Sequence, residues 1–230
     1  MITKESVLEN AKFMAFPILN NNTGEFSYSS SAENAEQGWT LLPKVKMVYR
    51  GYDRNSHHYT TEYHRKYVLP SMEKMFGFGY KESDFTIKEH LLDKNNMVFD
   101  LSYQVPVHDK KFTVRSIQYG LNYGCWFHGL RKNENTKHLT WFTEYHDLYC
   151  LPHTSSIVDN LGENNGKSLL VLGDSQLIPS VPIVCYYYKT VAYIDNRDKV
   201  PILGALDERY DDILVQTYVM PVGYYLDFLR

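Results

Sequence analysis

Apolar and polar residues are arranged most regularly in the last third of the chain. Three short apolar runs, at residues 168–172, 191–194 and 212–219, are separated by connections long enough to cross between parallel strands. Continuous apolar runs of this length are typical of strands that are buried on both faces of a parallel sheet. The pattern therefore predicts a β-α-β-α-β arrangement with right-handed connections.

Two further elements are predicted in the first third of the chain. Residues 12–19 (KFMAFPIL) favour a strand, and the long polar stretch after them favours a loop. Residues 60–76 carry apolar side chains at helical spacing, and Gly77 should end that helix. Pro70 should interrupt or kink the helix, because proline lacks the backbone N–H and crowds the preceding turn.

Residues 78–165 show the alternation that is typical of antiparallel β-structure. The stretches 97–107 (MVFDLSYQVPV) and 111–121 (KFTVRSIQYGL) flank a polar segment, which predicts a β-hairpin or a meander. Residues 139–151 (LTWFTEYHDLYCL) continue in residues that favour strands. We therefore expect a single domain over residues 1–230, in which residues 78–165 form a β-rich insertion.

Composition and charge exclude some functions. The 230 residues are 43% hydrophobic and 22% charged, and the net charge of −3 with a pI near 6.3 gives no electrostatic case for nucleic-acid binding. No run of 18 apolar residues exists, so no membrane span is expected. Twenty tyrosines are unusual. Tyrosine suits contacts with sugars or protein surfaces, but packing in the core is the favoured interpretation.

Cysteine content and the start of the chain bear on the compartment. Cys125, Cys150 and Cys185 cannot all pair within one chain, and none belongs to a C-x-x-C motif. The opening residues, MITKESVLENAKF, lack the apolar segment of a secretory signal. The cysteines favour a reducing compartment or unpaired thiols. The expected location is therefore either the cytoplasm or a larger assembly, which could be exported. Cys185 lies in an apolar segment and is expected in the core.

A Gly173-Asp174-Ser175 turn follows the first of the three apolar runs. Such a turn presents the serine hydroxyl at the carboxyl edge of the sheet, where α/β proteins bind ligands. If a helix follows, free N–H groups at its start, including that of Ser175, could hold a developing oxyanion. A serine that merely caps a helix would show the same local sequence. The turn therefore becomes a candidate nucleophile only together with a suitably placed histidine.

Two segments, residues 45–77 and 165–220, resemble SGNH-like proteins of the alginate O-acetyltransferase type, often called the DHHW group. In that group an Asp-x-His-Trp-Thr or Asp-His-His-Trp-Thr motif comes before a Gly-Asp-Ser turn. Here residues 56–60, Ser-His-His-Tyr-Thr, precede the predicted helix, and the Gly-Asp-Ser turn follows later in the chain. The resemblance implies a three-layer α/β/α fold with a mostly parallel sheet. It also implies acyl transfer to or from carbohydrate through a serine ester.

The resemblance implies a role for each residue of these motifs. Ser175 would be the nucleophile and His58 the general base, with His57 as the second candidate for the base. The family's aspartate, two residues before the histidine, is Ser56 in this chain, and its tryptophan is Tyr59. A serine–histidine pair needs a third group that fixes the tautomer of the ring. A turn over residues 54–56 could bring the carboxylate of Asp53 to that position. Asn55 or Ser56 could instead orient the ring without a charge.

Other candidates concern substrate and metal binding. Asn196, Arg197 and Asp174 are expected at the same sheet edge and are candidate substrate-binding residues. Solvated loop residues are the alternative interpretation for Asn196 and Arg197. Asp174 could instead accept backbone N–H bonds and hold the turn. The histidines at positions 57, 58 and 64 lack the partners of a zinc site, so neither a metal nor another cofactor is expected.

Two functions of different classes follow from these features. The first is a serine esterase or O-acyltransferase that acts on acylated carbohydrate or a small ester. The second is a binding or structural protein on the same scaffold, such as a component of a polysaccharide-modifying complex or a virus particle. Ser56 in the place of the aspartate and the abundance of tyrosine favour the second. A carboxylate against the His58 ring would distinguish the two functions, and exposed Tyr and Phe patches would favour the second.

Overall fold

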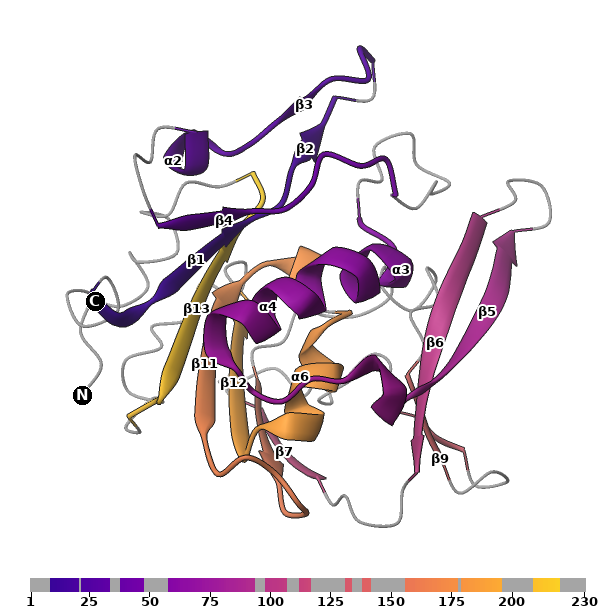
Figure 1. Ribbon diagram of the computed structural model, residues 1–230, viewed down its shortest axis with the longest axis vertical. Helices are drawn as coiled ribbons and strands as arrows, with labels where there is room; N and C mark the ends of the chain where they lie inside the picture. Colours follow the sequence, from indigo (N-terminus) through magenta and orange to yellow (C-terminus); the bar gives the residue numbers. More distant parts are fainter. Residues whose placement is uncertain are drawn as a thin grey trace.

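A computed structural model describes residues 9–20, 22–33, 38–47, 58–93, 98–106, 112–116, 131–133, 138–141, 156–177, 179–195 and 209–219. Within these residues the chain forms an α/β fold around a seven-stranded mixed sheet (Figure 1). None of the described helices is long and apolar enough to cross a membrane.

The strands and helices follow the sequence in a simple order. The strands are β1 (Lys12–Ala15), β2 (Ile18–Leu19), β3 (Phe26–Ser27), β4 (Trp39–Leu41), β5 (Thr86–Asp93), β6 (Val98–Pro106), β7 (Phe112–Ser116), β8 (Arg131–Asn133), β9 (His138–Trp141), β10 (Ser156–Asn160), β11 (Ser168–Gly173), β12 (Thr190–Asp195) and β13 (Asp212–Thr217). The helices are α2 (Ser30–Glu33), α3 (Thr61–Tyr63), α4 (Leu69–Phe76) and α6 (Val181–Tyr187), with a π-helical turn η1 (His64–Val68) and 3₁₀ turns η2 (Glu82–Asp84) and η3 (Ser175–Leu177).

The main sheet has the strand order β4-β1-β13-β11-β12-β10-β7. The pairs from β4 to β12 in this order are all parallel. Strand β10 is antiparallel to β12, and β7 is antiparallel to β10. The three strands expected from the apolar runs of the last third are adjacent, with β11 between β13 and β12. The prediction of an α/β fold with a mostly parallel sheet is therefore confirmed.

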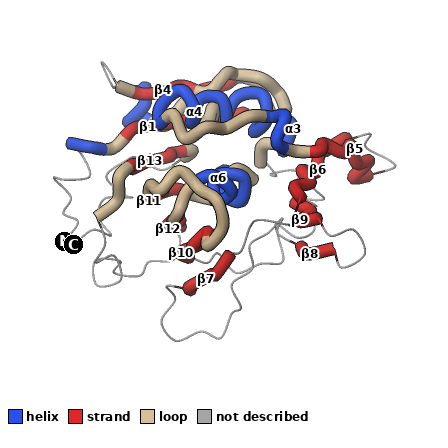
Figure 2. The backbone as a smooth tube through the Cα atoms, turned by 60° about the horizontal axis from the view of Figure 1, so that its bottom comes forward, coloured by secondary structure: helices blue, strands red, loops and turns tan. Residues whose placement is uncertain are grey.

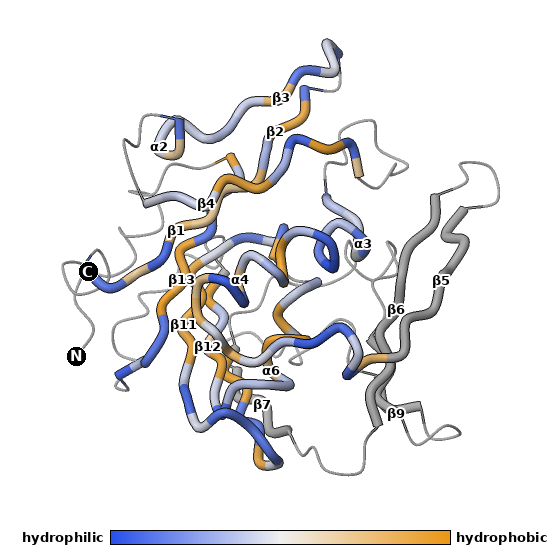
Figure 3. The backbone as a smooth tube through the Cα atoms, in the orientation of Figure 1, coloured by the Kyte–Doolittle hydropathy of each residue, from blue (hydrophilic) through white to orange (hydrophobic). Residues whose placement is uncertain are grey.

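Both faces of the central strands are buried. In β11, Leu169 and Val171 pack into the core beneath α4 and α6, while Leu170 and Leu172 are buried on the opposite face. Figures 1 and 2 show α4 and α6 on the same side of the sheet, and Figure 3 shows apolar residues concentrated in its strands. The third layer of the expected α/β/α arrangement stays a prediction.

The helix predicted over residues 60–76 is present but irregular. It begins as α3, widens into the π-helical turn η1 and continues as α4, which starts with Pro70 in its first turn. A wider turn before Pro70 is reasonable because proline cannot donate a backbone hydrogen bond and its ring crowds the preceding turn. Gly77 ends α4 in the left-handed region, at φ +59°, and its N–H donates to the carbonyl of Glu73.

Two predictions for the first two-thirds of the chain were wrong. Strands β6 and β7 do not form a hairpin or meander, because β6 joins a four-stranded antiparallel sheet, β5-β6-β9-β8, while β7 pairs with β10 in the main sheet. The single strand predicted at residues 12–19 is two strands in different sheets, β1 and β2. Pro17 stands between these strands, and proline has no N–H for a strand ladder. The division into one domain with an insertion remains a prediction.

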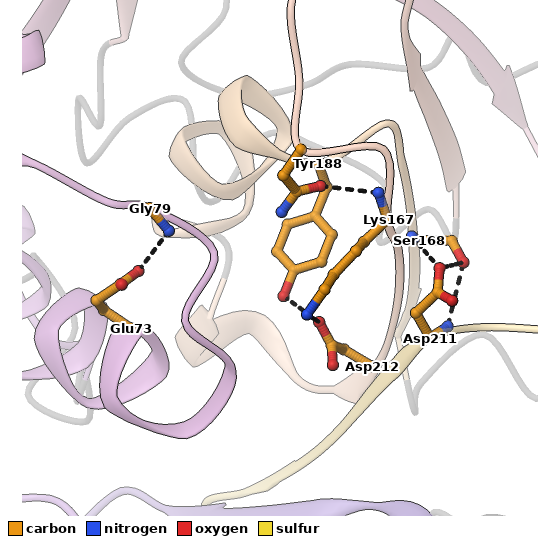
Figure 4. A network of polar contacts seen from close by, with 8 residues as sticks. Glu73, Gly79, Lys167, Ser168, Tyr188, Asp211 and Asp212 are labelled. Carbon is orange, nitrogen blue, oxygen red and sulfur yellow. Dashed lines mark hydrogen bonds and ion pairs between the residues drawn. The ribbon is translucent and has the colours of Figure 1, made fainter.

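Polar contacts tie together the amino ends of β11 and β13 (Figure 4). The hydroxyl of Tyr188 donates to Oδ2 of Asp212 over 2.7 Å, and Lys167 Nζ lies 3.6 Å from the same oxygen. Ser168 donates from its backbone N–H and its hydroxyl to Asp211, and these bonds lower the pKa of the Asp211 carboxyl. This edge of the sheet is therefore held by side chains, while the carboxyl edge carries the candidate site.

Candidate active site

Ser175 lies in the turn that follows β11, at the carboxyl edge of the parallel strands. The strand ends at Gly173, and Ser175 opens the 3₁₀ turn η3 with its side chain half-buried. The helix expected directly after Ser175 is confined to this turn, and α6 begins only at Val181. Pro179 explains the break, because an α-helix through Ser175 would require residue 179 to donate an N–H to the Ser175 carbonyl.

Asp174 is held from several directions. Its backbone N–H donates to Oε1 of Gln216 over 2.9 Å, and its Oδ1 accepts bonds from Gln216 Nε2 and the Gln176 N–H. The hydroxyl of Tyr193 donates to the Asp174 carbonyl over 2.9 Å. Asp174 is also buried. These contacts support the role of holding the turn; contact with a substrate stays a prediction for Asp174.

Gly173 is required by the close approach of Gln216. A Cβ at position 173 would lie 2.8 Å from Oε1 of Gln216, closer than such atoms pack. Gln216 comes from β13 and is fully buried, so its amide has no room to retreat toward solvent. The glycine therefore allows the β13 amide to reach the turn that presents Ser175.

His58 reaches Ser175 across 117 positions of sequence. Its Nε2 lies 2.8 Å from the Ser175 hydroxyl oxygen, which is hydrogen-bonding distance. The His58 ring is half-buried and its Nδ1 is buried. A neutral imidazole protonated on Nδ1 would accept the serine O–H at Nε2, which is the arrangement of a base beside its nucleophile.

The residues after His58 are fastened to three parts of the fold. The Tyr59 backbone N–H donates to Oε1 of Gln176 over 3.2 Å, and the Tyr59 hydroxyl donates to the Pro17 carbonyl over 2.7 Å. The Thr60 N–H donates to the carbonyl of Met47. Tyr59 is also stacked against Tyr63, with ring centroids 4.1 Å apart, and burial raises the pKa of its phenol. His58 is thus carried by a rigid backbone.

The backbone N–H of Ser175 is a candidate oxyanion donor. The next two N–H groups are engaged, since Gln176 donates to the Asp174 carboxylate and Leu177 to the Asp174 carbonyl. In the part of the chain that the structure describes, the Ser175 N–H makes no hydrogen bond. It is therefore open to an oxygen of a bound ester.

A second histidine–serine pair lies deeper in the fold. His64 Nδ1 is 2.7 Å from the Ser180 hydroxyl, and both side chains are fully buried. Burial, and to a smaller extent the nearby charge of His58, lower the pKa of His64 to about 3. His64 is therefore neutral at physiological pH. Because it is inaccessible to a ligand, we assign His64 a structural role in the core next to the site.

Several predicted site residues lie outside the described residues: Asp53, His57, Asn196 and Arg197. Among the residues that are described, no group of three metal-ligating side chains occurs. Cys185 lies in the core as expected, and burial raises the pKa of its thiol. Sequence reasoning missed Gln176 and Gln216. A glutamine inside the otherwise apolar run of β13 was a signal, because a buried amide must find partners.

Comparison with known proteins places the fold. No family model and no curated protein sequence matches this chain. A DHHW family protein from Eubacterium siraeum has a similar structure, with a TM-score of 0.56 and 12% identity over 95% of this chain and 82% of that one. Bacillus cereus PatB1 has a TM-score of 0.58 at 12% identity, covering 99% of this chain and 88% of its own. PatB1 with a sulfonyl adduct has a TM-score of 0.56 at 15% identity, covering 97% and 85%.

These similarities extend over nearly the whole chain, so they concern the complete fold and not one motif. At such low identity they show the fold alone. The chain therefore has an SGNH-like α/β fold, and one of its structural neighbours is a DHHW family protein, the group that its two short motifs resemble.

Proposed function

We propose that this protein is a serine-dependent ester hydrolase or O-acyltransferase that acts on acylated carbohydrate. The observation that carries the proposal is the 2.8 Å approach of His58 Nε2 to the Ser175 hydroxyl at the carboxyl edge of the sheet. A nucleophile needs a base within this reach, and the turn also offers the Ser175 N–H to a developing oxyanion. Ser175 and His58 would supply the nucleophile and the base, which are two of the three residues of a catalytic triad.

The chemistry proceeds in two acyl transfers. Ser175 Oγ attacks the carbonyl carbon of the ester while its proton passes to His58 Nε2. The tetrahedral intermediate collapses, the bond to the sugar oxygen breaks, and that oxygen takes the proton from His58. Water or a sugar hydroxyl then attacks the acyl-serine, gives its proton to His58, and releases Ser175 with its proton restored. Hydrolysis and transfer differ only in this second acceptor.

The third part of the mechanism is assigned from the sequence. We propose that Asp53 orients His58 through the ring N–H on Nδ1, since Ser56 occupies the position of the family's aspartate. His57 is the second candidate for the base. Asn196 and Arg197, which follow β12, are proposed to contact the substrate at the sheet edge, because β12 lies beside β11.

The preference for carbohydrate esters rests on the resemblance to the DHHW group. The sulfonyl adduct in the PatB1 structure suggests a suitable probe, because sulfonyl fluorides react with activated serine hydroxyls. Phenylmethanesulfonyl fluoride can therefore report an activated Ser175 without knowledge of the natural acyl donor.

The test combines labelling with turnover. We expect phenylmethanesulfonyl fluoride to modify Ser175, as located by peptide mass spectrometry, and the protein to hydrolyse 4-nitrophenyl acetate and acetylated oligosaccharides. Ser175→Ala and His58→Gln should each lower kcat at least about 10³-fold. Asp53→Asn should lower it about 10⁴-fold, the loss seen for the corresponding change in serine proteases. Ser168→Ala is the matched control, because Ser168 lies at the other end of the same strand.

Equal rates for the wild type and Ser175→Ala would rule out this mechanism. A wild type that is inert toward both the sulfonyl fluoride and every acetyl ester would favour the structural or binding protein on the same scaffold. An unchanged kcat in Asp53→Asn would exclude Asp53 from the mechanism and leave the roles of Ser175 and His58 intact. Adding oligosaccharide acceptors distinguishes transfer from hydrolysis, because transfer yields acetylated acceptor in place of free acetate.

A further inference from the structure

Gln176 connects the two halves of the candidate site. Gln176 follows Ser175 directly in the sequence. Its side-chain Oε1 accepts a hydrogen bond from the backbone N–H of Tyr59, the residue that follows His58. The nucleophile and the base are therefore joined through one short path of covalent bonds and a single hydrogen bond. Nothing in the sequence motifs singles out this glutamine.

The glutamine is itself rigidly placed. Its side chain is only 2% exposed, and its backbone N–H donates to the Asp174 carboxylate over 2.9 Å. Asp174 is in turn bound by the amide of Gln216 from β13. The acceptor that Gln176 presents to Tyr59 is thus fixed relative to the central sheet. A buried acceptor with fixed geometry defines the position of its donor closely.

We propose that Gln176 is a positioning residue, which acts through Tyr59 to hold the His58 ring at the Ser175 hydroxyl; its part in catalysis rests on the proposed function. The link that we assign to Gln176 is indirect, through the hydrogen bond from the Tyr59 N–H to its Oε1. The bond restricts the movement of Tyr59, because a shift of its buried N–H away from Gln176 would leave that donor without an acceptor. Since His58 is the preceding residue, its position is restricted as well. Small displacements matter here, since about 1 Å of misplacement can cost about 10²-fold in rate.

Three variants separate positioning from plain structural support. Gln176→Met keeps the length of the side chain but removes the acceptor. Gln176→Glu keeps an acceptor oxygen and adds a negative charge near His58. Asn160→Leu is the matched control, because Asn160 is another buried amide with three backbone acceptors, but these lie at Glu163, Cys185 and Tyr186.

In turnover of 4-nitrophenyl acetate, Gln176→Met should lower kcat about 10²-fold, with KM within about twofold of the wild type. Gln176→Glu should recover part of that loss and move the pH–rate profile to higher pH, because a nearby carboxylate favours the protonated imidazole. Asn160→Leu should lower the urea midpoint while kcat stays within about twofold, measured where each variant is folded.

A second readout needs no turnover. The ¹⁵N signals of the His58 ring, identified by their loss in His58→Gln, should shift or broaden in Gln176→Met and remain in place in Asn160→Leu. If the wild type has Ser175-dependent activity, an unchanged kcat or an unchanged His58 signal in Gln176→Met overturns the proposal. If the wild type is inactive, the proposed function fails and the signal alone decides whether Gln176 positions His58.

Discussion

The hydroxyl of Ser175 owes its place to contacts that its neighbours make. Gln216 binds the backbone and the carboxylate of Asp174, and Gly173 leaves the space that this amide fills. Asp174 and Gln216 are both buried, so water does not compete for the hydrogen bonds between them. A small change in one of these side chains should therefore displace the Ser175 hydroxyl.

Gly173→Ala tests this dependence. The added Cβ would meet Gln216 Oε1 at 2.8 Å, and overpacking of this kind costs about 1–3 kcal/mol of unfolding free energy. We expect that loss in urea denaturation, together with lower esterase activity, because the displaced amide releases Asp174.

A double-mutant cycle identifies the cause. In a Gln216→Ala background the oxygen that the Cβ would strike is gone, so the alanine should cost at least about 0.5 kcal/mol less than it does alone. If the costs of the two single changes simply add, the clash with Gln216 is not the reason for the loss.

At the scale of elements, the irregular helix of residues 61–76 carries a buried histidine in its π-helical turn. His64 is fully buried against Ser180, Phe16 and Tyr63, and the charge of His58 also acts on it. The folded protein thus keeps a neutral imidazole where an unfolded chain would expose one. Burial of His64 should therefore make the free energy of unfolding decrease as the pH falls.

The direction of that dependence follows from the pKa. An exposed histidine in the unfolded chain has a pKa near 6.5, whereas His64 in the fold has a pKa of about 3. Between these values the unfolded state binds more protons, so this contribution is full above about pH 6.5 and is lost as pH falls toward 3. The unfolding constant should rise by up to about tenfold per pH unit of acidification from this group.

Urea denaturation between pH 4 and 8 measures this contribution as a difference between variants. His64→Gln should flatten the acid slope, whereas Ser180→Ala should keep it, because that variant retains the buried imidazole. Parallel slopes for the wild type and His64→Gln would show that other groups cause the acid sensitivity.

At the scale of the whole molecule, the main sheet is most protected at its centre. Strand β11 is paired on both sides, by β12 and β13, and its side chains from Leu169 to Leu172 are buried on both faces. Among the strands that the structure describes, β4 pairs with β1 alone, and Leu41 at its end is 46% exposed. Opening of the sheet should therefore begin away from the site-bearing strand.

Amide hydrogen exchange followed by mass spectrometry should reveal this order. Peptides that contain β11 and β13 should exchange with the slowest, global rate, while the β4 amides should exchange through local opening at a lower free energy. Slower exchange in β4 than in β11 would contradict this description of the sheet.

The sequence by itself determined the local features of this protein. Apolar runs predicted β11, β12 and β13 nearly to the residue, since a strand buried on both faces needs no polar positions. Gly77 ended the predicted helix because the left-handed conformation there suits glycine. The short motifs also named Ser175 and His58 as candidates, through resemblance and not through spacing alone.

Only the tertiary structure decided which segments meet. Alternation predicted strands in β6 and β7 but could not choose their partners, because strand pairing is made between residues distant in sequence. For the same reason the local pattern did not reveal Gln216 beneath the Asp174 turn or Gln176 against Tyr59. A side chain's partners depend on the path of the whole chain, whereas its preference for helix, strand or turn depends mainly on its neighbours in sequence.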